Sequence, residues 1–503
     1  MTVALTTPIS WKNASGDDAA MLDNLQPNIL KPHTRDFMVA LFLQFTDDVG
    51  ARAFLRDVEG HMKSAREHLV EIEKFKEDPS VPGTPYVGVG LTAPGYHALG
   101  IAQVPSDPSF NAGMSKGDLH DPDVGEWDPH FRERESLHAV IVIGDMTIDP
   151  VFDLHAAILT KIRAANGVVL LGTQEGRGMH NANGEGIEHF GYVDGRSQPL
   201  FFTEDIDDEK LKSDGTSKWD AGFPLGQAIV PDPAAPNPNL HFGSYFVFRK
   251  LEQNVRKFKE EEANFAKRLE TELGKVQTPP KQMRLDADAF ERAGALLVGR
   301  FEDGTPATLQ SAPGAHSPVP NDFDYESDKA GAKCPFFGHI RKTNPRGDGG
   351  FEKPEVERAH LMPRRGQTYG VRVDNPNDGQ TNNKPTKDVG LLFMAFNSDI
   401  ANQFEFMQDA WANSPGFPKG KGAGVDPIIG QTENDSPRPR VTCPVVWGDS
   451  GNKSMVTIDS IPRTVTMKGG EYFFMPSLAF LRTLAASQTP APTTGALHPQ
   501  TDA

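Results

Sequence analysis

The sequence predicts an α+β protein made of two ferredoxin-like halves, each with the element order β-α-β-β-α-β. Short apolar runs rich in β-branched and aromatic residues have the length of strands, and stretches with helical periodicity lie between them. The same order of elements occurs twice along the 503 residues. This length allows two or three domains, or one large fold with two cores.

The first half contains four expected strands, at 37–45, 86–91, 139–143 and 168–171. Between the first two strands, residues 49–74 are helical in character, with Gly60 as a candidate break. The second expected helix covers 151–165, where Val151, Leu154, Ile158 and Ile162 recur at helical spacing. Residues 1–205 are therefore expected to form the N-terminal domain.

The second half, residues 206–487, repeats this order with longer inserts. Its expected strands are 244–248, 369–373, 389–396 and 472–475. One helix is expected to present an apolar face from Leu251 to Leu273 and to end at Gly274, and another covers about 399–411. Three stretches depart from the pattern: 120–135 is densely acidic, and 277–285 and 311–329 are rich in Pro, Asp and small residues. The tail 488–503 has few apolar residues and is expected to be disordered.

Composition excludes several classes of partner. Lys and Arg number 51 against 68 Asp and Glu, a net charge of −17, and no basic cluster occurs, which argues against nucleic acid or anionic lipid as a partner. No apolar run is long enough to span a membrane. Two cysteines, Cys334 and Cys443, cannot make a disulfide framework. No secretory signal is visible in the first 23 residues, so a cytoplasmic location is expected, with a homo-oligomer left open.

Three segments contain residues suited to catalysis. In HFGYVDGRSQP, residues 189–199, Gly191 and Gly195 flank Asp194. Asp-Gly is a common turn dipeptide, but glycines on both sides also allow a planar ligand to approach a carboxylate that acts in acid–base chemistry. In the second segment, 333–346, His339 follows an apolar Pro-Phe-Phe-Gly stretch and precedes a basic run. A histidine is most often a packing residue, yet this setting suits a haem with anionic propionates.

The third segment, 360–370, contains the pair Arg364 and Arg365. Paired arginines are usually solvated, but one of them directed inward beside a carboxylate could stabilise negative charge that develops on oxygen. No Gly-x-Ser-x-Gly, HExxH or GxxxxGK[ST] motif occurs, so the sequence gives no support for a serine hydrolase, a zinc protease or a nucleotide-binding loop.

Taken together, these segments resemble the dye-decolourising peroxidases. Residues 191–195 fit the GxxDG signature of that family, HIRKTNPR at 339–346 resembles its proximal-histidine segment, and RRGxxYG at 364–370 resembles the segment with its distal arginine. The similarity extends from about residue 22 to 485 and includes 25–37, 390–408 and 424–430. The length resembles that of the large bacterial and fungal members.

The resemblance implies one haem b (iron-protoporphyrin IX) per chain, held mainly by the C-terminal half. His339 would be the axial ligand of the iron, and Asp194 the distal acid–base. Arg364 stands six positions before Gly370 and would be the distal arginine, with Arg365 as the alternative.

Further residues follow from the same resemblance. Arg346 would pair with a haem propionate, and Asp426 would accept the second imidazole N–H of His339. The pocket wall would include Leu391, Leu392 and Phe393, although a buried strand explains these three equally well.

The implied activity is a haem-dependent peroxidase that reduces hydrogen peroxide and oxidises dyes, phenols and other aromatic reductants. Aspartates have an ordinary pKa of about 3.9, so an aspartate base predicts that dye oxidation works best under acidic conditions. The alternatives are a haem-handling protein of the deferrochelatase kind and a non-catalytic haem-binding protein. Within the acidic stretch, residues 120–130 could form a Mn²⁺ site, against a solvated loop as the default. For Tyr369 and Trp411, core packing is expected.

Overall fold

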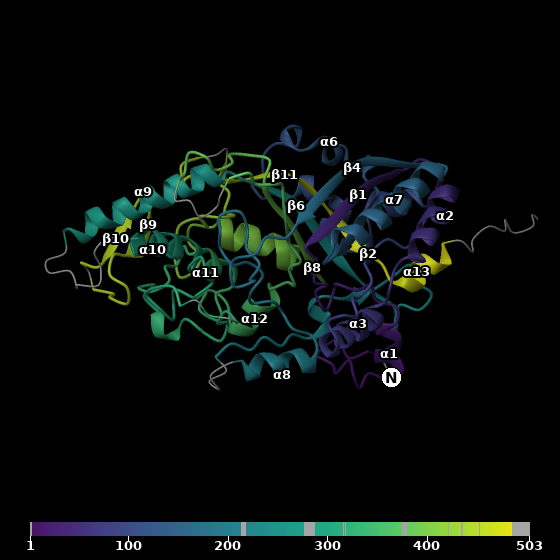
Figure 1. Ribbon diagram of the computed structural model, residues 1–503, viewed down its shortest axis with the longest axis horizontal. Helices are drawn as coiled ribbons and strands as arrows, with labels where there is room; N and C mark the ends of the chain where they lie inside the picture. The colour runs from purple at the N-terminus through teal and green to yellow at the C-terminus, as the bar shows by residue number, and fades with distance from the viewer. Residues whose placement is uncertain are drawn as a thin grey trace, which may run out of the picture.

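The computed structural model describes residues 3–212, 218–275, 287–314, 316, 318–374, 380–420, 422–433, 436–451 and 453–484. The insert expected at 277–285 and the tail expected at 488–503 lie outside the described residues. Figure 1 shows the strands of the main sheet gathered in one part of the molecule, with the helices α2 and α7 beside them, and α9 and α10 at the far end with β9 and β10.

Two antiparallel four-stranded units form the main sheet. Their strands are β1 Phe37–Phe45, β2 Tyr86–Leu91, β3 Ala139–Asp145 and β4 Val168–Arg177 in the first, and β6 Phe242–Gln253, β7 Gln367–Tyr369, β8 Gly390–Asn397 and β11 Val465–Met475 in the second. The strand order β4-β1-β3-β2 of the first unit is matched by β11-β6-β8-β7 in the second. This doubled order is the one that two ferredoxin-like halves produce, so the predicted fold class is confirmed.

The two units join at both ends. The pairing of Phe474 with Leu91 connects β11 to β2. At the other end, β4 lies against β7, where the Thr368 hydroxyl donates to the Arg177 carbonyl. The three-residue strand β7 therefore covers part of the edge of β4. The domain boundary expected at residues 205/206 stays a prediction.

Some helices lie beside the sheet, and others form the part of the molecule that lies away from it. The long ones are α2 Asp48–Glu59, α3 Ala65–Glu77, α7 Ile148–Ala164, α9 Val255–Leu273 and α10 Ala287–Val298. The shorter ones are α1 Gly16–Leu22, α4 Ala93–Ala98, α5 Pro108–Ala112, α6 Pro129–Arg132, α8 Thr203–Leu211, α11 His339–Thr343, α12 Pro354–Ala359 and α13 Leu478–Thr483. Two small strands, β9 Val441–Pro444 and β10 Met455–Ile458, pair with each other, and β5 Val230–Pro231 pairs with β6. The break expected at Gly60 separates α2 from α3.

Three expected elements differ from the structure. Leu251 lies in β6, paired with Leu391 and Met467, rather than on the following helix. The strand expected at 369–373 is β7 and ends at Tyr369, because Gly370 has φ +85° and a Cβ there would lie 2.2 Å from the Asp388 carbonyl oxygen. The helix expected at 399–411 is instead two π-helical segments, η6 Ala401–Glu405 and η7 Met407–Asn413.

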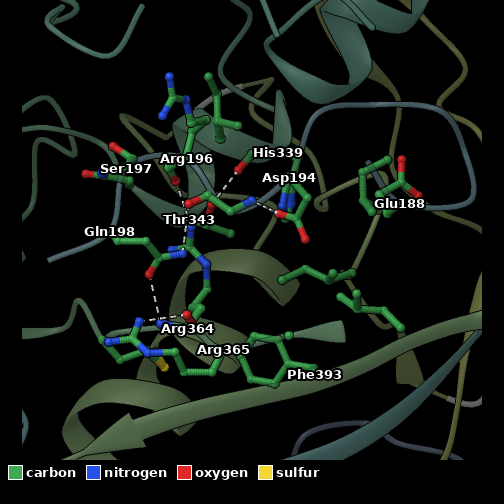
Figure 2. Close-up of a pocket in the computed structure, with 18 of the residues that line it drawn as sticks. Glu188, Asp194, Arg196, Ser197, Gln198, His339, Thr343, Arg364, Arg365 and Phe393 are labelled. Atoms are coloured by element: carbon green, nitrogen blue, oxygen red, sulfur yellow. Dashed lines mark hydrogen bonds between the residues drawn. The ribbon is translucent and has the colours of Figure 1, made fainter. Parts of the chain in front are cut away.

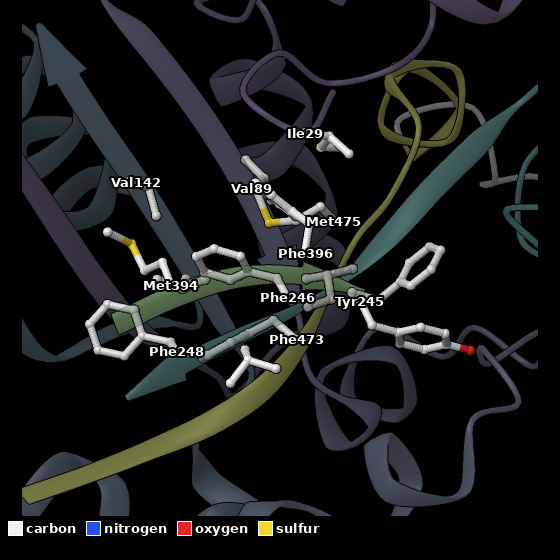
Figure 3. Close-up of a cluster of buried hydrophobic side chains, with 14 of the residues drawn as sticks. Ile29, Val89, Val142, Tyr245, Phe246, Phe248, Met394, Phe396, Phe473 and Met475 are labelled. Atoms are coloured by element: carbon white, nitrogen blue, oxygen red, sulfur yellow. The ribbon is translucent and has the colours of Figure 1, made fainter. Parts of the chain in front are cut away.

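Aromatic side chains from β6, β8 and β11 fill the centre of the sheet (Figure 3). Phe246 packs against Phe396 at 5.1 Å and against Phe473 at 6.4 Å between ring centroids. Each of these rings is nearly or fully buried. This cluster therefore supplies a large share of the apolar burial that stabilises the sheet. No helix in the described part of the chain is both long enough and apolar enough to cross a membrane.

Replacing Phe473 by alanine is expected to lower the free energy of unfolding by about 3–5 kcal/mol, because it opens a cavity in this cluster. Urea denaturation measures the loss. Phe152→Ala is the matched control, since that ring is 62% exposed and its removal is expected to change stability by less than about 0.5 kcal/mol. Equal losses in the two variants would contradict the assignment of the core.

Candidate functional site

A cavity of about 450 Å³ lies between β6, β8, α11, the start of β7 and two irregular segments, 188–198 and 360–366. Strand alternation explains its wall: Arg249, Leu251 and Gln253 of β6 line it from one face, while Phe246 and Phe248 point to the core from the other. The cavity brings together side chains that are far apart in the sequence (Figure 2). Among these lining residues are Glu188, Asp194, Arg196, Gln198, Val298, Arg300, His339, Arg346, Arg364, Arg365, Leu391, Phe393 and Val465.

On one side of the cavity, a buried carboxylate orients His339. The histidine begins α11, and its Nδ1 lies 2.9 Å from Oδ2 of Asp426. Asp426 is fully buried, and its Oδ1 accepts the backbone N–H groups of Ile428 and Ile429 at 2.8 and 3.0 Å. For Nε2 of His339, the hydrogen bonds described for the chain include no partner. The imidazole therefore presents an available nitrogen from a wall of the cavity.

Electrostatics agree with this geometry. Burial by itself lowers the pKa of His339, but the charge and hydrogen bond of Asp426 outweigh it, so this pKa is raised above its ordinary value. Burial raises the pKa of Asp426, yet His339 and the two backbone donors outweigh it and lower that pKa. The pair is therefore mutually stabilising in a place where either group alone would be costly.

A carboxylate and an arginine lie together in another part of the wall. Asp194 is exposed to the cavity, and its Oδ1 accepts the N–H of Gly195 at 2.6 Å. Gly191 and Gly195 have φ of +102° and +79°, conformations that favour glycine. Arg364 lies close enough to interact with this loop: its Nη2 donates to the Arg196 carbonyl at 3.0 Å. Burial lowers the pKa of Arg364, and the charge of Asp194 opposes that shift.

The neighbouring Arg365 is used differently. Its guanidinium donates to the carbonyls of Asn28, Ile29 and Arg364 at 2.8 to 2.9 Å. Burial and the charges of Arg35 and Arg364 lower its pKa to about 9. All three guanidinium nitrogens of Arg365 donate to backbone carbonyls. Arg364 is therefore the member of the pair whose guanidinium is better placed to contact a ligand.

Arg346 lies at a cationic end of the cavity. Its guanidinium donates to the Asn321 carbonyl at 2.7 Å and to the Ser197 hydroxyl at 2.6 Å, and it lies 3.7 Å from the centre of the Phe323 ring. Burial lowers its pKa to about 10. Arg300 also lines the cavity and adds a second positive charge; its Nη1 donates to the Gly304 and Pro320 carbonyls.

These residues fit a haem. An apolar wall that includes Phe190, Leu251, Val298 and Val465 suits a planar macrocycle, and the arginines suit its anionic carboxylates. The imidazole nitrogen of His339 suits an iron ligand, and its carboxylate partner is typical of a metal-binding histidine. All five residues named from the sequence for this site, Asp194, His339, Arg346, Arg364 and Asp426, lie in the cavity wall or contact it.

Two wall residues expected from the sequence are found and one is not. Leu391 and Phe393 line the cavity. Leu392 points the opposite way, into the core beside Met394, because successive side chains of a strand alternate between its faces. Tyr369 and Trp411 are buried in the core, as expected.

Two carboxylates of the acidic stretch at 120–130 form ion pairs with lysine and arginine side chains of β6. Asp121 binds both terminal nitrogens of Arg249, and Asp128 lies 2.7 Å from Nζ of Lys250. Within the described ranges, no cluster of three or more potential metal ligands occurs. The hypothesis of a Mn²⁺ site in this stretch therefore has no support in the geometry.

Lys342 is a buried cation that sequence analysis missed. Its Nζ donates to the carbonyls of Ser414, Phe417 and Gly424. These bonds join α11, which carries His339, to the loop that leads to Asp426. The only sequence signal was a lysine in the HIRK turn, which does not reveal that its side chain would be buried.

Glu188 is a second missed residue. Its carboxylate accepts the N–H groups of Phe190 and Tyr192 at 2.7 and 3.0 Å and a hydrogen bond from Gln253. Burial raises its pKa from 4.5 to about 7, although these donors oppose the shift. Glu188 therefore closes the turn that precedes Asp194.

Comparison with known proteins gives a consistent result. The family model described as "DyP dimeric alpha+beta barrel domain" matches residues 24–170. The "Multifunctional dye peroxidase DyP2" of Amycolatopsis sp. is 56% identical over 490 residues, which cover 96% of this chain and 100% of that protein. Its solved structure superposes with a TM-score of 0.87, at 54% identity over 96% of this chain and 100% of that one.

Two further matches differ in extent. A structure described as a DyP-type peroxidase of Anabaena sp. has a TM-score of 0.83 and 36% identity over 95% of this chain and 97% of that one. In contrast, a "Deferrochelatase" of Yersinia pestis is 37% identical over only 86 residues, 17% of this chain and 16% of that protein. Similarity across the whole chain is therefore to peroxidases.

Replacing Lys342 by methionine is expected to lower the free energy of unfolding by at least about 2 kcal/mol, because the buried carbonyls of Phe417 and Gly424 lose their donor at about 1–3 kcal/mol each. Urea denaturation measures the change. Lys387→Met, at a side chain that is 73% exposed, is the control and is expected to have an effect below about 0.5 kcal/mol. A stability for Lys342→Met close to that of the control would show that the three bonds contribute little.

The raised pKa of Glu188 predicts a pH dependence of stability. Between its ordinary value of 4.5 and about 7, the folded state retains a proton that the unfolded state releases, so the free energy of unfolding falls as pH rises through this window. Glu188→Gln removes the titration, so the fall between pH 4.5 and 8 should be smaller in the variant. Urea denaturation of both proteins at these two pH values tests this, and equal falls would reject the assigned shift.

Proposed function

Because the chain belongs to the dye-decolourising peroxidase family, whose members are haem enzymes, we propose that it binds one haem b in the cavity and reduces hydrogen peroxide while oxidising dyes, phenols and other aromatic compounds. The chain is an oxidoreductase that acts on peroxide. The observation that carries the proposal is the meeting of His339, Asp194 and Arg364 in one cavity with an apolar wall and a cationic end.

On the histidine side, the chain orients a metal ligand. Asp426 accepts the Nδ1 proton of His339, so the lone pair of Nε2 is held toward the cavity. Arg346 would pair with one of the anionic propionates. When bound, haem supplies the iron that takes up peroxide and passes on the electrons of the reducing substrate.

On the other side, two side chains handle the proton and the charge. The Asp194 carboxylate accepts a proton from one oxygen of hydrogen peroxide and returns it to the other oxygen, which leaves as water. The Arg364 guanidinium stabilises the negative charge that develops as the O–O bond breaks. The apolar side chains of the wall, including Leu391 and Phe393, keep bulk water away from these groups.

A haem-handling role is the second function considered from the sequence. Removing iron or storing haem requires the ligand and the cavity, whereas the pairing of Asp194 with Arg364 serves peroxide chemistry. The full-length similarity to dye peroxidases also favours the enzymatic function. The cytoplasmic location and the homo-oligomer expected from the sequence stay predictions.

The decisive experiment is an absorption spectrum of the purified protein before and after one equivalent of hydrogen peroxide. A Soret band that shifts with peroxide is expected, and His339→Ala is expected to lose or strongly alter the band. Asp194→Asn and Arg364→Ala should retain haem but react with peroxide on the order of 10²-fold more slowly.

Three results would change the proposal. A Soret band that does not respond to peroxide would favour haem handling. A failure to take up haem, even after reconstitution, would reject the assignment. A loss of reactivity in Arg365→Ala, with Arg364→Ala unaffected, would transfer the role to Arg365.

A further inference from the structure

The amide side chain of Gln198 connects the two segments that carry Asp194 and Arg364, in addition to the bond from Nη2 of Arg364 to the Arg196 carbonyl. Oε1 of Gln198 accepts the backbone N–H of Arg364 at 2.9 Å, and its Nε2 donates to the Gly195 carbonyl at 3.1 Å (Figure 2). Gln198 is half-buried in the cavity wall. Both polar ends of this amide are therefore used, one for each segment.

The backbone of Arg364 depends on side chains for its hydrogen bonds. Its segment runs along β8, and the ladder bonds are made by its neighbours: Arg365 N–H donates to Met394, and Phe396 N–H donates to Pro363. The backbone N–H and carbonyl of Arg364 itself point away from β8. The N–H donates to the Gln198 side chain, and the carbonyl accepts a hydrogen bond from the Arg365 guanidinium.

The loop that carries Asp194 is held on its N-terminal side, where the Asp194 N–H donates to the Gly186 carbonyl at 3.0 Å, and its next residues depend on Gln198. Gly195 has a left-handed φ of +79°, and Ser197 has φ +65°. The Gly195 N–H is bonded to the Asp194 carboxylate, and among the hydrogen bonds described, the Gly195 carbonyl is bonded to Gln198 alone. Loss of the Gln198 amide would therefore remove the one described hydrogen bond to the Gly195 carbonyl, at the residue next to Asp194.

We infer that Gln198 is a positioning residue that fixes the spacing between the Asp194 carboxylate and the Arg364 guanidinium. The inference rests on the proposed function, because that spacing matters only if the two groups act on the same peroxide. Gln198 itself touches backbone on both sides. Losing it is expected to slow the reaction with peroxide on the order of 10²-fold, the effect of displacing a reacting group by about 1 Å.

The test uses two substitutions of Gln198 and one control in the haem-loaded protein. Gln198→Leu removes both hydrogen bonds at similar size. Gln198→Glu removes the donor when ionised, but a protonated carboxyl has one acceptor and one donor and restores both bonds. Gln310→Leu is the matched control, because its amide bonds only to His316 in the described hydrogen bonds and does not line the cavity.

The first readout is kcat/KM for hydrogen peroxide against pH. The ratio of Gln198→Glu to the unsubstituted protein should rise as pH falls from 7 toward the ordinary glutamate pKa of about 4.3. The charged and titratable groups that line the cavity near this loop include Arg35, Glu188, Asp194, Arg196, Arg300, His339, Arg346, Arg364 and Arg365. The arginines favour the ionised form of the introduced glutamate and lower its pKa. The recovery of kcat/KM in Gln198→Glu is therefore expected at the acidic end of the range. For Gln198→Leu, the ratio should stay low at every pH.

The second readout does not depend on activity. Amide hydrogen exchange at Arg364 should be faster in Gln198→Leu, because the N–H has lost its acceptor, and unchanged in Gln310→Leu. Haem content per chain should be equal in the unsubstituted protein and in all three variants. Unchanged exchange and unchanged peroxide reactivity in Gln198→Leu would overturn the inference, as would equal losses in the Leu and Glu variants at all pH values.

The two proposals fail in distinguishable ways. If the unsubstituted protein binds haem but does not react with peroxide, the proposed function fails, and the pH comparison has no rate to follow. If the unsubstituted protein reacts and Asp194→Asn is impaired while Gln198→Leu is not, the positioning role alone is rejected.

Discussion

The alternation of side chains along β6 and β8 is the constraint on which the rest of the structure depends. These strands pair in register, so Phe246 faces Phe396 on one side of the sheet while Leu251 faces Leu391 on the other. One side packs the aromatic core and the other side forms the wall of the cavity. A shift by one residue would exchange the two sides, placing Arg249 in the core and the aromatic rings in the site.

The buried charged groups around the cavity have hydrogen-bonding partners supplied by the chain. Asp426 is paired with His339 and bonded to two backbone N–H groups, and the Lys342 ammonium is enclosed by three carbonyls. The guanidinium of Arg365 is likewise held by carbonyls. Burial of such groups is costly without partners, so each also fixes the loop that provides them. The same contacts that satisfy the charges thus rigidify the site.

The site is assembled from two distant parts of the chain. The loop with Asp194 lies between the two ferredoxin-like halves in sequence, whereas His339, Arg364 and Asp426 belong to long connections of the second half. These connections carry short helices and turns rather than strands, so they can differ in length without disturbing the sheet. Gln198 and Lys342 show how such connections are tied together: a side chain from one segment satisfies backbone groups of another.

The sequence by itself predicted the fold class and the doubled helix and strand pattern, because apolar periodicity is a local signal. The family motifs also singled out five candidate site residues, which lie in or against one cavity and whose roles stay predictions. It did not determine that Leu392 faces the core, that β7 ends at Tyr369, or that Asp121 and Asp128 are taken by Arg249 and Lys250. Those outcomes depend on which segment packs against which. The choice of Arg364 over Arg365 was likewise left open by spacing alone, and the geometry favours Arg364, because only the folded chain brings the carbonyls of residues 28 and 29 to the Arg365 guanidinium.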